Sequence, residues 1–244
     1  MALFNESLIH PYAYLIGGII FFAVWLALFI IRKDLRRQML VMSLIGSIFT
    51  PIALVFLPDY WYPEHILGSF LGIEDYLFAF AIAGIGSVIY EATAGKTHTL
   101  CDCRKRSQKD LLIIALGAVA ILLVLTFAFD LNSIYSNYVA FFAIFGFIIF
   151  FRRDLLWQSL MSGFMVGLLM FFFYQIWITI YPGIIEHWWK LENISGILVL
   201  GVPLEEIVWG FSWGIAGGSL YEFMRGVGMK NKIRNQFHQI VLNR

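Results

Sequence analysis

Apolar residues in this chain gather in seven long runs that are separated by short polar segments. A helix needs about 20 mostly apolar residues to cross the hydrocarbon core of a bilayer. The runs that approach or exceed this length are 13–31, 39–57, 76–94, 111–129, 138–151, 155–181 and 194–223. The fifth run is short, and the seventh is long enough to include a break at Pro203. The pattern predicts an all-α integral membrane protein with seven transmembrane helices.

The overall composition agrees with this interpretation. Hydrophobic residues make up 60% of the chain and charged residues 14%, and the mean hydropathy is +0.80. A soluble domain has about 45–50% apolar and about 25% charged residues, so the composition excludes that class. The formal net charge is only +1, so no basic surface argues for a nucleic-acid partner.

Lysine and arginine residues are distributed unevenly between the two sides of the predicted bundle. The segments after the first, third, fifth and seventh runs hold 16 of the 17 residues, and Lys190 alone lies on the opposite side. Cytoplasmic loops carry an excess of these residues. We therefore expect a multi-pass protein of the plasma membrane, with its N-terminus outside and its C-terminus in the cytoplasm.

Two pairs of similar segments indicate an internal duplication. The stretch RRDLLWQSL at 152–160 resembles RKDLRRQML at 32–40, and LEEIVWGF at 204–211 resembles IEDYLFAF at 73–80. The two offsets differ by 11 residues, which an insertion in the loop region explains. Runs one to three and five to seven are therefore expected to be two copies of a three-helix unit. Because three is an odd number, the fourth helix returns the chain, and both copies run in the same direction, as in parallel-repeat transporters.

This duplication predicts how the chain is organised. We expect a first three-helix repeat at 1–95, a cytoplasmic loop and linker helix at 96–133, a second three-helix repeat at 134–226 and a basic cytoplasmic tail at 227–244. The fold class is thus two parallel three-helix repeats joined by a linker helix. Small residues at helical spacing, Gly163-x-x-x-Gly167 and Gly214-x-x-x-Gly218, are expected to permit close helix packing.

Ionisable side chains inside a membrane are costly and therefore mark functional candidates. Acidic pairs open the third and seventh runs, and they are Glu74, Asp75, Glu205 and Glu206. A second matched pair, Glu91 and Glu222, follows 17 residues later, which is about 25 Å along a helix. The first set is therefore expected toward the outer leaflet. The second set is expected at the basic cytoplasmic end, with a structural role.

The outer carboxyl groups lie in surroundings that suit acid catalysis. No Lys or Arg occurs within ten residues of either outer pair. A buried carboxyl group without a compensating cation can stay protonated near neutral pH, which is the state that a general acid needs. Aromatic rings can attract a cationic intermediate, and the candidate substrate contacts are Trp61, Phe78, Trp209, Phe211 and Trp213. Two simpler interpretations stay open: an aromatic belt at the membrane interface, and acids that merely favour helix N-termini.

A short motif occurs at both outer acidic pairs. The second copy reads Pro203-Leu204-Glu205-Glu206, and the first reads Gly72-Ile73-Glu74-Asp75, with glycine in place of proline. Upstream of the first copy, Asp59-x-Trp61 is followed by Leu67-Gly68. Together with the seven predicted helices and the tandem copies, these motifs resemble the membrane-integral lycopene cyclases of the heterodimeric or fused type. In that family the motif is Pro-x-Glu-(Glu/Asp), and phenylalanine is usual where this chain has Trp209.

The resemblance implies a redox-neutral isomerisation that closes a ring at the end of a linear polyene. A protonated glutamate would donate a proton to the terminal double bond, an internal double bond would attack the resulting cation, and a carboxylate would remove a ring proton. The implied catalytic residues are Glu205 and Glu206, completed by Glu74 and Asp75. Adjacent carboxyl groups titrate as a coupled set, so the acid and the base stay unassigned.

The resemblance also implies a set of partners. The substrate would be a linear carotenoid or another long isoprenoid, surrounded by membrane lipid. We expect no cofactor, no metal and no nucleic-acid partner, and the oligomeric state stays open.

Other membrane-protein classes fit the sequence less well. A proton-coupled small-molecule transporter, or a non-catalytic isoprenoid-binding membrane protein, is the alternative. An intramembrane protease of the Glu-Glu-x-x-x-Arg kind is excluded because Gly210 stands where the arginine would be. Prenyltransferases need an Asp-x-x-x-Asp cluster and retinal proteins need a Schiff-base lysine in the last span, and the sequence has neither.

Overall fold

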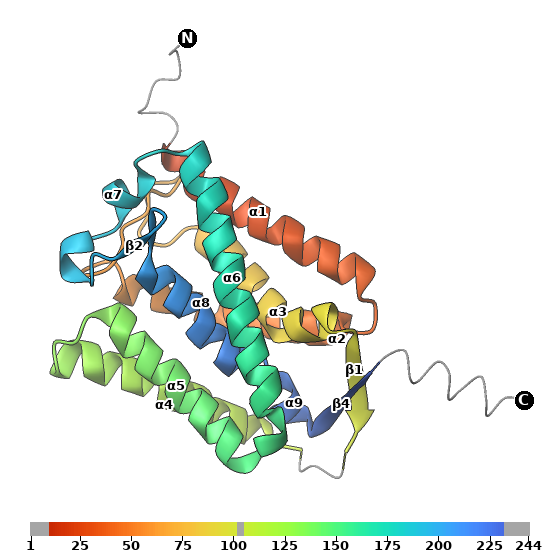
Figure 1. Ribbon diagram of the computed structural model, residues 1–244. Coiled ribbons are helices and arrows are strands. Elements are labelled where there is room, and N and C mark those ends of the chain that lie inside the picture. The colour runs from red at the N-terminus through yellow and green to blue at the C-terminus, as the bar shows by residue number, and fades with distance from the viewer. Residues whose placement is uncertain (1–9, 102–104, 232–244) are drawn as a thin grey trace, which may run out of the picture.

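The computed structural model describes residues 10–101 and 105–231 (Figure 1). The first half of this part contains α1 (His10–Ile31), α2 (Arg36–Phe49), the 3-10 helix η2 (Thr50–Val55), α3 (Ile73–Thr93), the strand β1 (Lys96–Leu100) and α4 (Gln108–Ala128). The second half contains α5 (Ser133–Phe151), η3 (Arg153–Leu155), α6 (Leu156–Ile180), α7 (Ile184–Trp188), η4 (Leu191–Asn193), β2 (Leu198–Val199), β3 (Val202–Pro203), α8 (Leu204–Gly217), α9 (Leu220–Arg225) and β4 (Val227–Asn231). The expected basic tail lies mostly outside the described residues.

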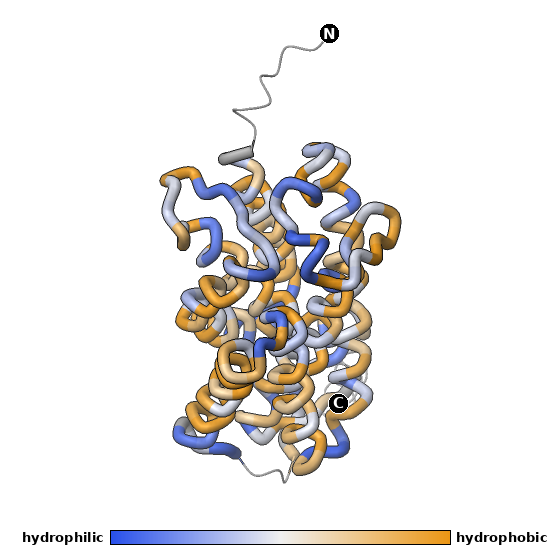
Figure 2. Tube along the Cα trace, turned by 90° about the vertical axis from the view of Figure 1, so that its left-hand side faces the viewer, coloured by the Kyte–Doolittle hydropathy of each residue, from blue (hydrophilic) through white to orange (hydrophobic). Residues whose placement is uncertain are grey.

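Six of the described helices are long and apolar enough to cross a membrane. They occupy Tyr12–Ile31, Arg36–Val55, Ile73–Thr93, Lys109–Ala128, Ser133–Phe151 and Arg153–Ile180. Hydrophobic residues dominate the middle of the molecule, and hydrophilic residues gather at the top and bottom of the view in Figure 2. The prediction of a largely helical membrane protein is therefore confirmed.

The expected seventh span, 194–223, is not one continuous helix. Its first part forms the β2–β3 hairpin, in which Leu200 and Gly201 have φ values of 52° and 86°. Pro203 then caps α8, at the predicted break, and α8 ends at Gly217 before the short α9 begins. Glycine is a poor helix former, and the adjacent glycines at 217 and 218 end α8. Its 14 residues give a helix about 21 Å long, shorter than the hydrocarbon core of a bilayer.

The fifth span is longer than its apolar run predicts. The helix α5 begins at Ser133 because the Asn132 side chain accepts a hydrogen bond from the amide of Ile134, at 3.0 Å. Asp59, from the distant loop after η2, accepts bonds from the amide and hydroxyl of Ser133, at 2.8 and 2.5 Å. These polar residues cap the helix. A hydropathy pattern does not reveal such caps, so it underestimates the length of the helix.

Glycines bring pairs of helices into close contact. The helix α6 crosses in front of α8 in Figure 1, and these two helices pack extensively. A Cβ atom on Gly214 would lie 2.7 Å from the carbonyl oxygen of Ser162 and from the Cα of Gly163. On the other side of the bundle, a Cβ on Gly46 of α2 would lie 2.7 Å from the carbonyl oxygen of Ala79 in α3. The expected role of Gly163 and Gly214 in close helix packing is confirmed.

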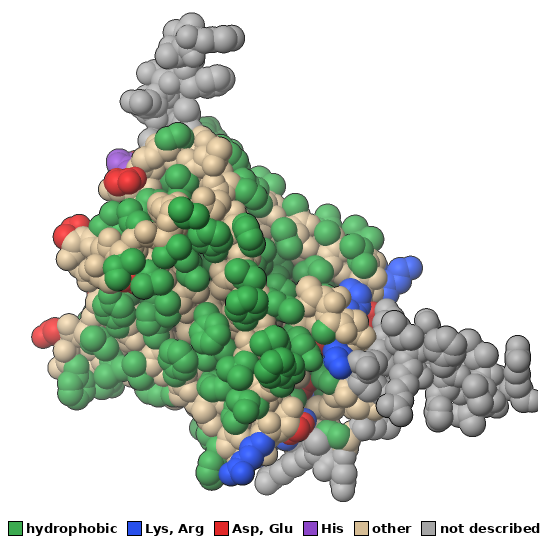
Figure 3. All heavy atoms as spheres, in the orientation of Figure 1, with side chains coloured by type: hydrophobic (Ala, Val, Ile, Leu, Met, Phe, Trp, Pro, Cys, Tyr) green, Lys and Arg blue, Asp and Glu red, His purple; other side chains and the backbone are tan. Residues whose placement is uncertain are grey.

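One pairing of distant segments was not predicted from the sequence. The strands β1 and β4 form an antiparallel ladder, with Lys96 opposite Asn231 and Leu100 opposite Val227. This ladder follows α3 and α9 and lies at the end where Lys and Arg side chains gather on the face shown in Figure 3. It connects the ends of the two halves of the chain.

Candidate active site

An apolar cavity of about 300 Å³ lies between the two halves of the bundle. Residues of α1, α2, η2 and α3 line one side, and residues of α4, α5, α6 and α8 line the other. Two carboxylic acids contribute to its wall, Asp75 from α3 and Glu206 from α8. Both are buried, with exposed fractions of 4% and 6%. The cavity therefore combines an apolar interior with two carboxyl groups, one from each half of the chain.

Three neutral donors hold the Glu206 carboxyl group. Its Oε1 accepts hydrogen bonds from the hydroxyl of Tyr60 at 2.5 Å and the indole N–H of Trp189 at 2.9 Å. Its Oε2 accepts one from the hydroxyl of Tyr174 at 2.8 Å. The residue before Leu204 is Pro203, which has no N–H to donate to this carboxyl group. Side chains from two separate loops and from α6 therefore position Glu206 at the cavity.

Asp75 has a different set of partners. Its Oδ2 contacts Nε2 of His65 at 2.7 Å and accepts a hydrogen bond from the Gly72 amide at 2.7 Å. Its Oδ1 accepts one from the hydroxyl of Tyr14 at 2.9 Å. The glycine that replaces the motif proline thus supplies a backbone donor that the second copy lacks. A Cβ at position 72 would also lie 2.7 Å from Cδ2 of His65, so glycine leaves room for the histidine.

The other two acids of the motifs turn away from the cavity. Oε1 of Glu74 accepts a hydrogen bond from the Ile66 amide at 2.9 Å. Oε1 of Glu205 accepts bonds from the Ser195 amide at 2.9 Å and the Tyr135 hydroxyl at 3.1 Å. Neither carboxyl group belongs to the cavity wall. The structure therefore divides the four candidate acids into two at the cavity and two that bond the outer loops.

Four of the five candidate aromatic residues line the cavity: Trp61, Phe78, Trp209 and Trp213. The rings of Phe78 and Trp209 have centroids 6.0 Å apart. Phe211 lies elsewhere, because one residue in three or four along a helix faces the same side. Its ring and backbone lie beside the glycines of α6, so that a Cβ on Gly163 would approach Cδ2 of Phe211 to 3.1 Å. Phe211 is thus part of the α6–α8 contact.

Five partner residues of the two acids are not among the catalytic and substrate-contact candidates named from the sequence: Tyr14, Tyr60, His65, Tyr174 and Trp189. A buried tyrosine or tryptophan needs a partner for its polar group, so tyrosines inside apolar runs were the available signal. An isolated backbone bridge between Trp61 and Trp189 holds the two outer loops together. The pairing of loops distant in sequence, which brings Tyr60 and Trp189 to Glu206, has no local sequence signal.

The contact between His65 and Asp75 predicts that the stability of the fold depends on pH. Burial lowers the pKa of His65, but the hydrogen bond and the negative charge of Asp75 outweigh burial, and the net direction is upward from 6.5. A raised pKa means that protonated His65 stabilises the fold below about pH 6.5 and that this contribution is lost as the pH rises through the folded-state value. We expect the unfolding midpoint of His65→Gln to lie furthest below that of the wild type at low pH. Thermal unfolding between about pH 5.5 and 9 measures this difference.

The control for this prediction is His187→Gln. His187 lies in α7 and contacts Glu64 at 3.3 Å, with more than half of its side chain exposed. We expect its substitution to leave the pH dependence unchanged. A stability difference between His65→Gln and the wild type that is constant over the whole pH range would contradict the assignment.

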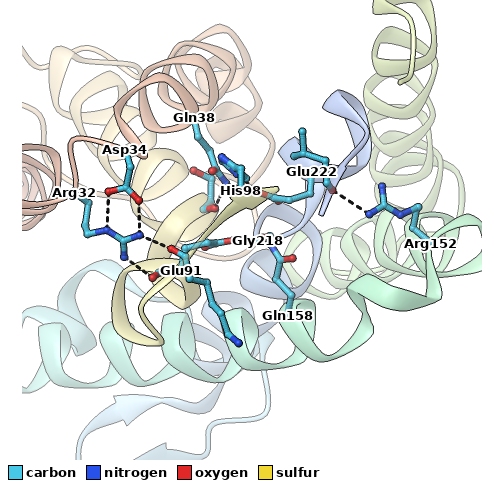
Figure 4. A network of polar contacts seen from close by, with 12 residues as sticks. Arg32, Asp34, Gln38, Glu91, His98, Arg152, Gln158, Gly218 and Glu222 are labelled. Carbon is cyan, nitrogen blue, oxygen red and sulfur yellow. Dashed lines mark hydrogen bonds and ion pairs between the residues drawn. The ribbon is translucent and has the colours of Figure 1, made fainter. Parts of the chain in front are cut away.

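A second buried polar cluster lies at the opposite end of the bundle (Figure 4). Nε2 of Gln38 donates to Oε1 of Glu222 at 2.9 Å and to the Ser87 carbonyl at 2.5 Å. Nε2 of Gln158 donates to Oε1 of Glu91 at 2.6 Å and to the Gly218 carbonyl at 2.8 Å. Each half of the chain therefore supplies a glutamine to the glutamate of the other half, and this supports the expected structural role of the inner acids.

Further contacts extend this inner cluster toward the strands. Arg32 pairs with Asp34 at 2.8 Å and donates to the carbonyl of Lys96 at 2.5 Å. Arg152 pairs with Asp154 at 2.7 Å and donates to the carbonyl of Val227 at 3.1 Å. His98 of β1 contacts Oε1 of Glu222 at 2.9 Å. The cluster ties α1, α2 and α5 to the β1–β4 ladder.

Gln158 should be important for stability because its side-chain amide donates hydrogen bonds to two buried acceptors. In Gln158→Leu, the Glu91 carboxylate and the Gly218 carbonyl lose their donor, and each unsatisfied buried group costs about 1–3 kcal/mol. Gln175→Leu on the same helix is the control, because its bond to the Leu200 carbonyl is exposed, and it should cost at most about 0.5 kcal/mol. Thermal unfolding in detergent measures both. Equal midpoints for the two variants would contradict the prediction.

Metal ligands do not cluster in the described residues. No group of three or more His, Cys, Asp or Glu side chains there could hold a metal ion. The polar groups that line the cavity include carboxyl, phenol, hydroxyl and amide groups, the last two from Thr50 and Asn137. The imidazole of His65 and the indole of Trp189 bond the two acids. The arrangement is suited to proton transfer inside an apolar cavity.

Comparison with known proteins agrees with this chemistry. The sequence model of a family described as lycopene cyclase matches residues 12–93 and 132–224. No curated protein and no solved structure matches the chain. The two matched stretches cover most of the chain and include both acidic motifs with their cavity-lining aromatic residues. This chain belongs to the lycopene cyclase family.

Proposed function

We propose that this protein is a carotenoid β-cyclase that closes a ring at an end group of a linear, lycopene-type polyene through a carbocation. The observation that supports this most directly is the apolar cavity that carries two buried carboxyl groups, Asp75 and Glu206, among aromatic rings. Family membership supports a carotenoid substrate and an enzyme of the cyclase type. The reaction is an isomerisation, because one proton is gained and one is lost.

In this mechanism Glu206 is the general acid. Its hydrogen-bond partners among the described residues are all neutral, so no cation opposes its protonation. Glu206 donates its proton to the terminal double bond of the polyene, and a cation forms on the adjacent carbon. The internal double bond attacks this carbon, closes a six-membered ring and moves the positive charge onto the ring.

Asp75 is the general base. Its contact with His65 and the hydrogen bond from the Gly72 amide hold its carboxyl group at the cavity wall. The carboxylate removes a ring proton, and a ring double bond forms as the positive charge is lost. Asp75 then holds one proton more and Glu206 one proton fewer than at the start, so the loss of a proton from Asp75 and the return of one to Glu206 restore both acids.

Aromatic rings favour the cationic stage of the reaction. The rings of Phe78, Phe141, Trp209 and Trp213 line the cavity, and Phe141 lies 5.4 Å from Trp213 between ring centroids. The negative faces of such rings attract a cation by about 0.5–2 kcal/mol each. The apolar wall also keeps water from capturing the carbocation.

We propose further that the two halves of the chain are repeats related by an axis along the membrane normal. The reciprocal bonds Gln38 to Glu222 and Gln158 to Glu91 support this arrangement. In the proposed orientation the inner cluster lies at the cytoplasmic side, where the described Lys and Arg residues gather, and the cavity acids lie toward the outer leaflet. The predicted boundaries of the two repeats, 1–95 and 134–226, are part of this proposal.

The test of the proposed function is pigment analysis of bacterial cells that accumulate lycopene and express this chain. A known cyclase expressed in the same cells is the positive control. We expect conversion of lycopene to a monocyclic or bicyclic carotene. Unchanged lycopene, with the protein verified in the membrane fraction, would overturn the proposal.

A further inference from the structure

The cavity continues from the acids as an apolar slot between α4 and the α2–η2 segment. One face of α4 lines it, and this face consists of Leu111, Ile114, Ala115, Ala118, Val119 and Leu122. These positions recur at helical spacing, so they form one stripe. From Leu111 to Leu122 the stripe extends about 16 Å along the helix axis.

The opposite wall of the slot comes from α2 and η2, through residues such as Ile45, Phe49 and Ala53. Away from the acids, the slot ends at Met42 and Leu220, which belong to a separate hydrophobic cluster with Phe223. The two carboxyl groups and this cluster therefore lie at opposite ends of the slot, and Thr50 belongs to the α2–η2 wall between them. A rod-shaped apolar molecule can place only one of its ends at the acids.

The slot opens sideways toward the bilayer. Within the described chain, α5 is the helix against which α4 packs extensively, and only 11% of the α4 span is buried, less than in the other candidate spans. Lining residues such as Ala53 and Ala118 are half-buried. The neighbouring side chains of Ile48 and Ile113 are 73% and 67% exposed. An apolar rim of this kind suits lipid and not water.

We propose that this slot binds the polyene body of the linear carotenoid, which reaches it from the bilayer through the opening between α4 and the α2–η2 segment. This inference rests on the proposed function. With one end group at Asp75 and Glu206, the adjoining polyene lies along the α4 stripe. The full carotenoid is longer than the slot, so the remainder extends through the opening into the membrane. Close packing against apolar side chains, and not hydrogen bonding, selects such a ligand.

The experiment uses a tryptophan on each face of α4. Ala118→Trp fills the slot, whereas Ala120→Trp places the same side chain on the exposed face of the same helix. Ala53→Trp narrows the slot from the opposite wall. Two quantities are measured in lycopene-accumulating cells. The first is the conversion of lycopene to cyclic carotene by each tryptophan variant of the wild-type protein. The second is the amount of lycopene that co-purifies with each tryptophan variant of the inactive Glu206→Gln protein. Size-exclusion chromatography verifies that each variant is folded.

We expect Ala118→Trp and Ala53→Trp to lower both quantities by about tenfold or more, and Ala120→Trp to leave both unchanged. The proposed binding slot would be wrong if folded Ala118→Trp and Ala120→Trp proteins gave equal conversion and equal co-purification of lycopene. It would also be wrong if the Glu206→Gln protein without a tryptophan substitution retained no lycopene. If the wild type converts no lycopene but retention still depends on residue 118, the reaction is wrong and the binding slot is supported.

Discussion

Glu206→Gln is expected to lower the rate of lycopene cyclisation by about 10²–10⁴-fold, the usual contribution of a general acid. Glutamine has the same size, and its amide can keep partners among Tyr60, Tyr174 and Trp189. It cannot supply the proton that starts the reaction. The measurement is the ratio of cyclic to linear carotenoid in lycopene-accumulating cells, normalised to the amount of protein in the membrane.

The adjacent Glu205→Gln is a closely matched control. Glu205 is equally buried, at 3% exposed, but its carboxyl group bonds the Ser195 amide and the Tyr135 hydroxyl and lies outside the cavity wall. A glutamine oxygen can accept the same bonds, so we expect less than about a tenfold loss of activity. Comparable losses in the two variants, or full activity in Glu206→Gln, would refute the assignment of Glu206.

Asp75→Asn is expected to cause a loss of similar size, about 10²–10⁴-fold, because it removes the base that takes the ring proton. Asparagine retains an acceptor for the Tyr14 hydroxyl or the Gly72 amide, so the start of α3 should remain folded. Glu74→Gln is the matched control, since the Glu74 carboxyl group bonds the Ile66 amide outside the cavity wall. The same pigment ratio measures both variants.

Deuterium distinguishes the acid from the base. In the Glu206→Gln variant the first proton transfer is blocked. When cells that have expressed this variant are transferred to heavy water, their lycopene should therefore gain no deuterium from the enzyme. Without Asp75 the end group can still be protonated, and when the cation loses the original hydrogen of the protonated carbon instead of the added deuteron, linear lycopene that carries deuterium is returned. Mass spectrometry of recovered lycopene measures the label. Deuterium in the Glu206→Gln sample, and none in the Asp75→Asn sample, would reverse the two roles.

The first motif has glycine at position 72, where the family motif has proline. From the sequence it is only a departure from the family pattern. In the structure Gly72 donates its N–H to Asp75 and leaves space for His65, whereas Pro203 leaves Glu206 to side-chain donors. The two copies of the motif therefore hold their acids differently. This asymmetry supports different roles for the two acids in one reaction.

The membrane class, six of the expected spans and the family follow from the amino-acid sequence, because the length of an apolar run and a short acidic motif are local properties. Which acid of each pair reaches the cavity depends on the packing of the helices. Neighbouring residues point about 100° apart on a helix, and the packing of surrounding helices selects the direction that faces inward. The partners of the acids also come from afar, as with Tyr60 and Glu206, which are 146 residues apart. No local pattern encodes such a contact, since it forms only when the outer loops and α6 pack together over the cavity.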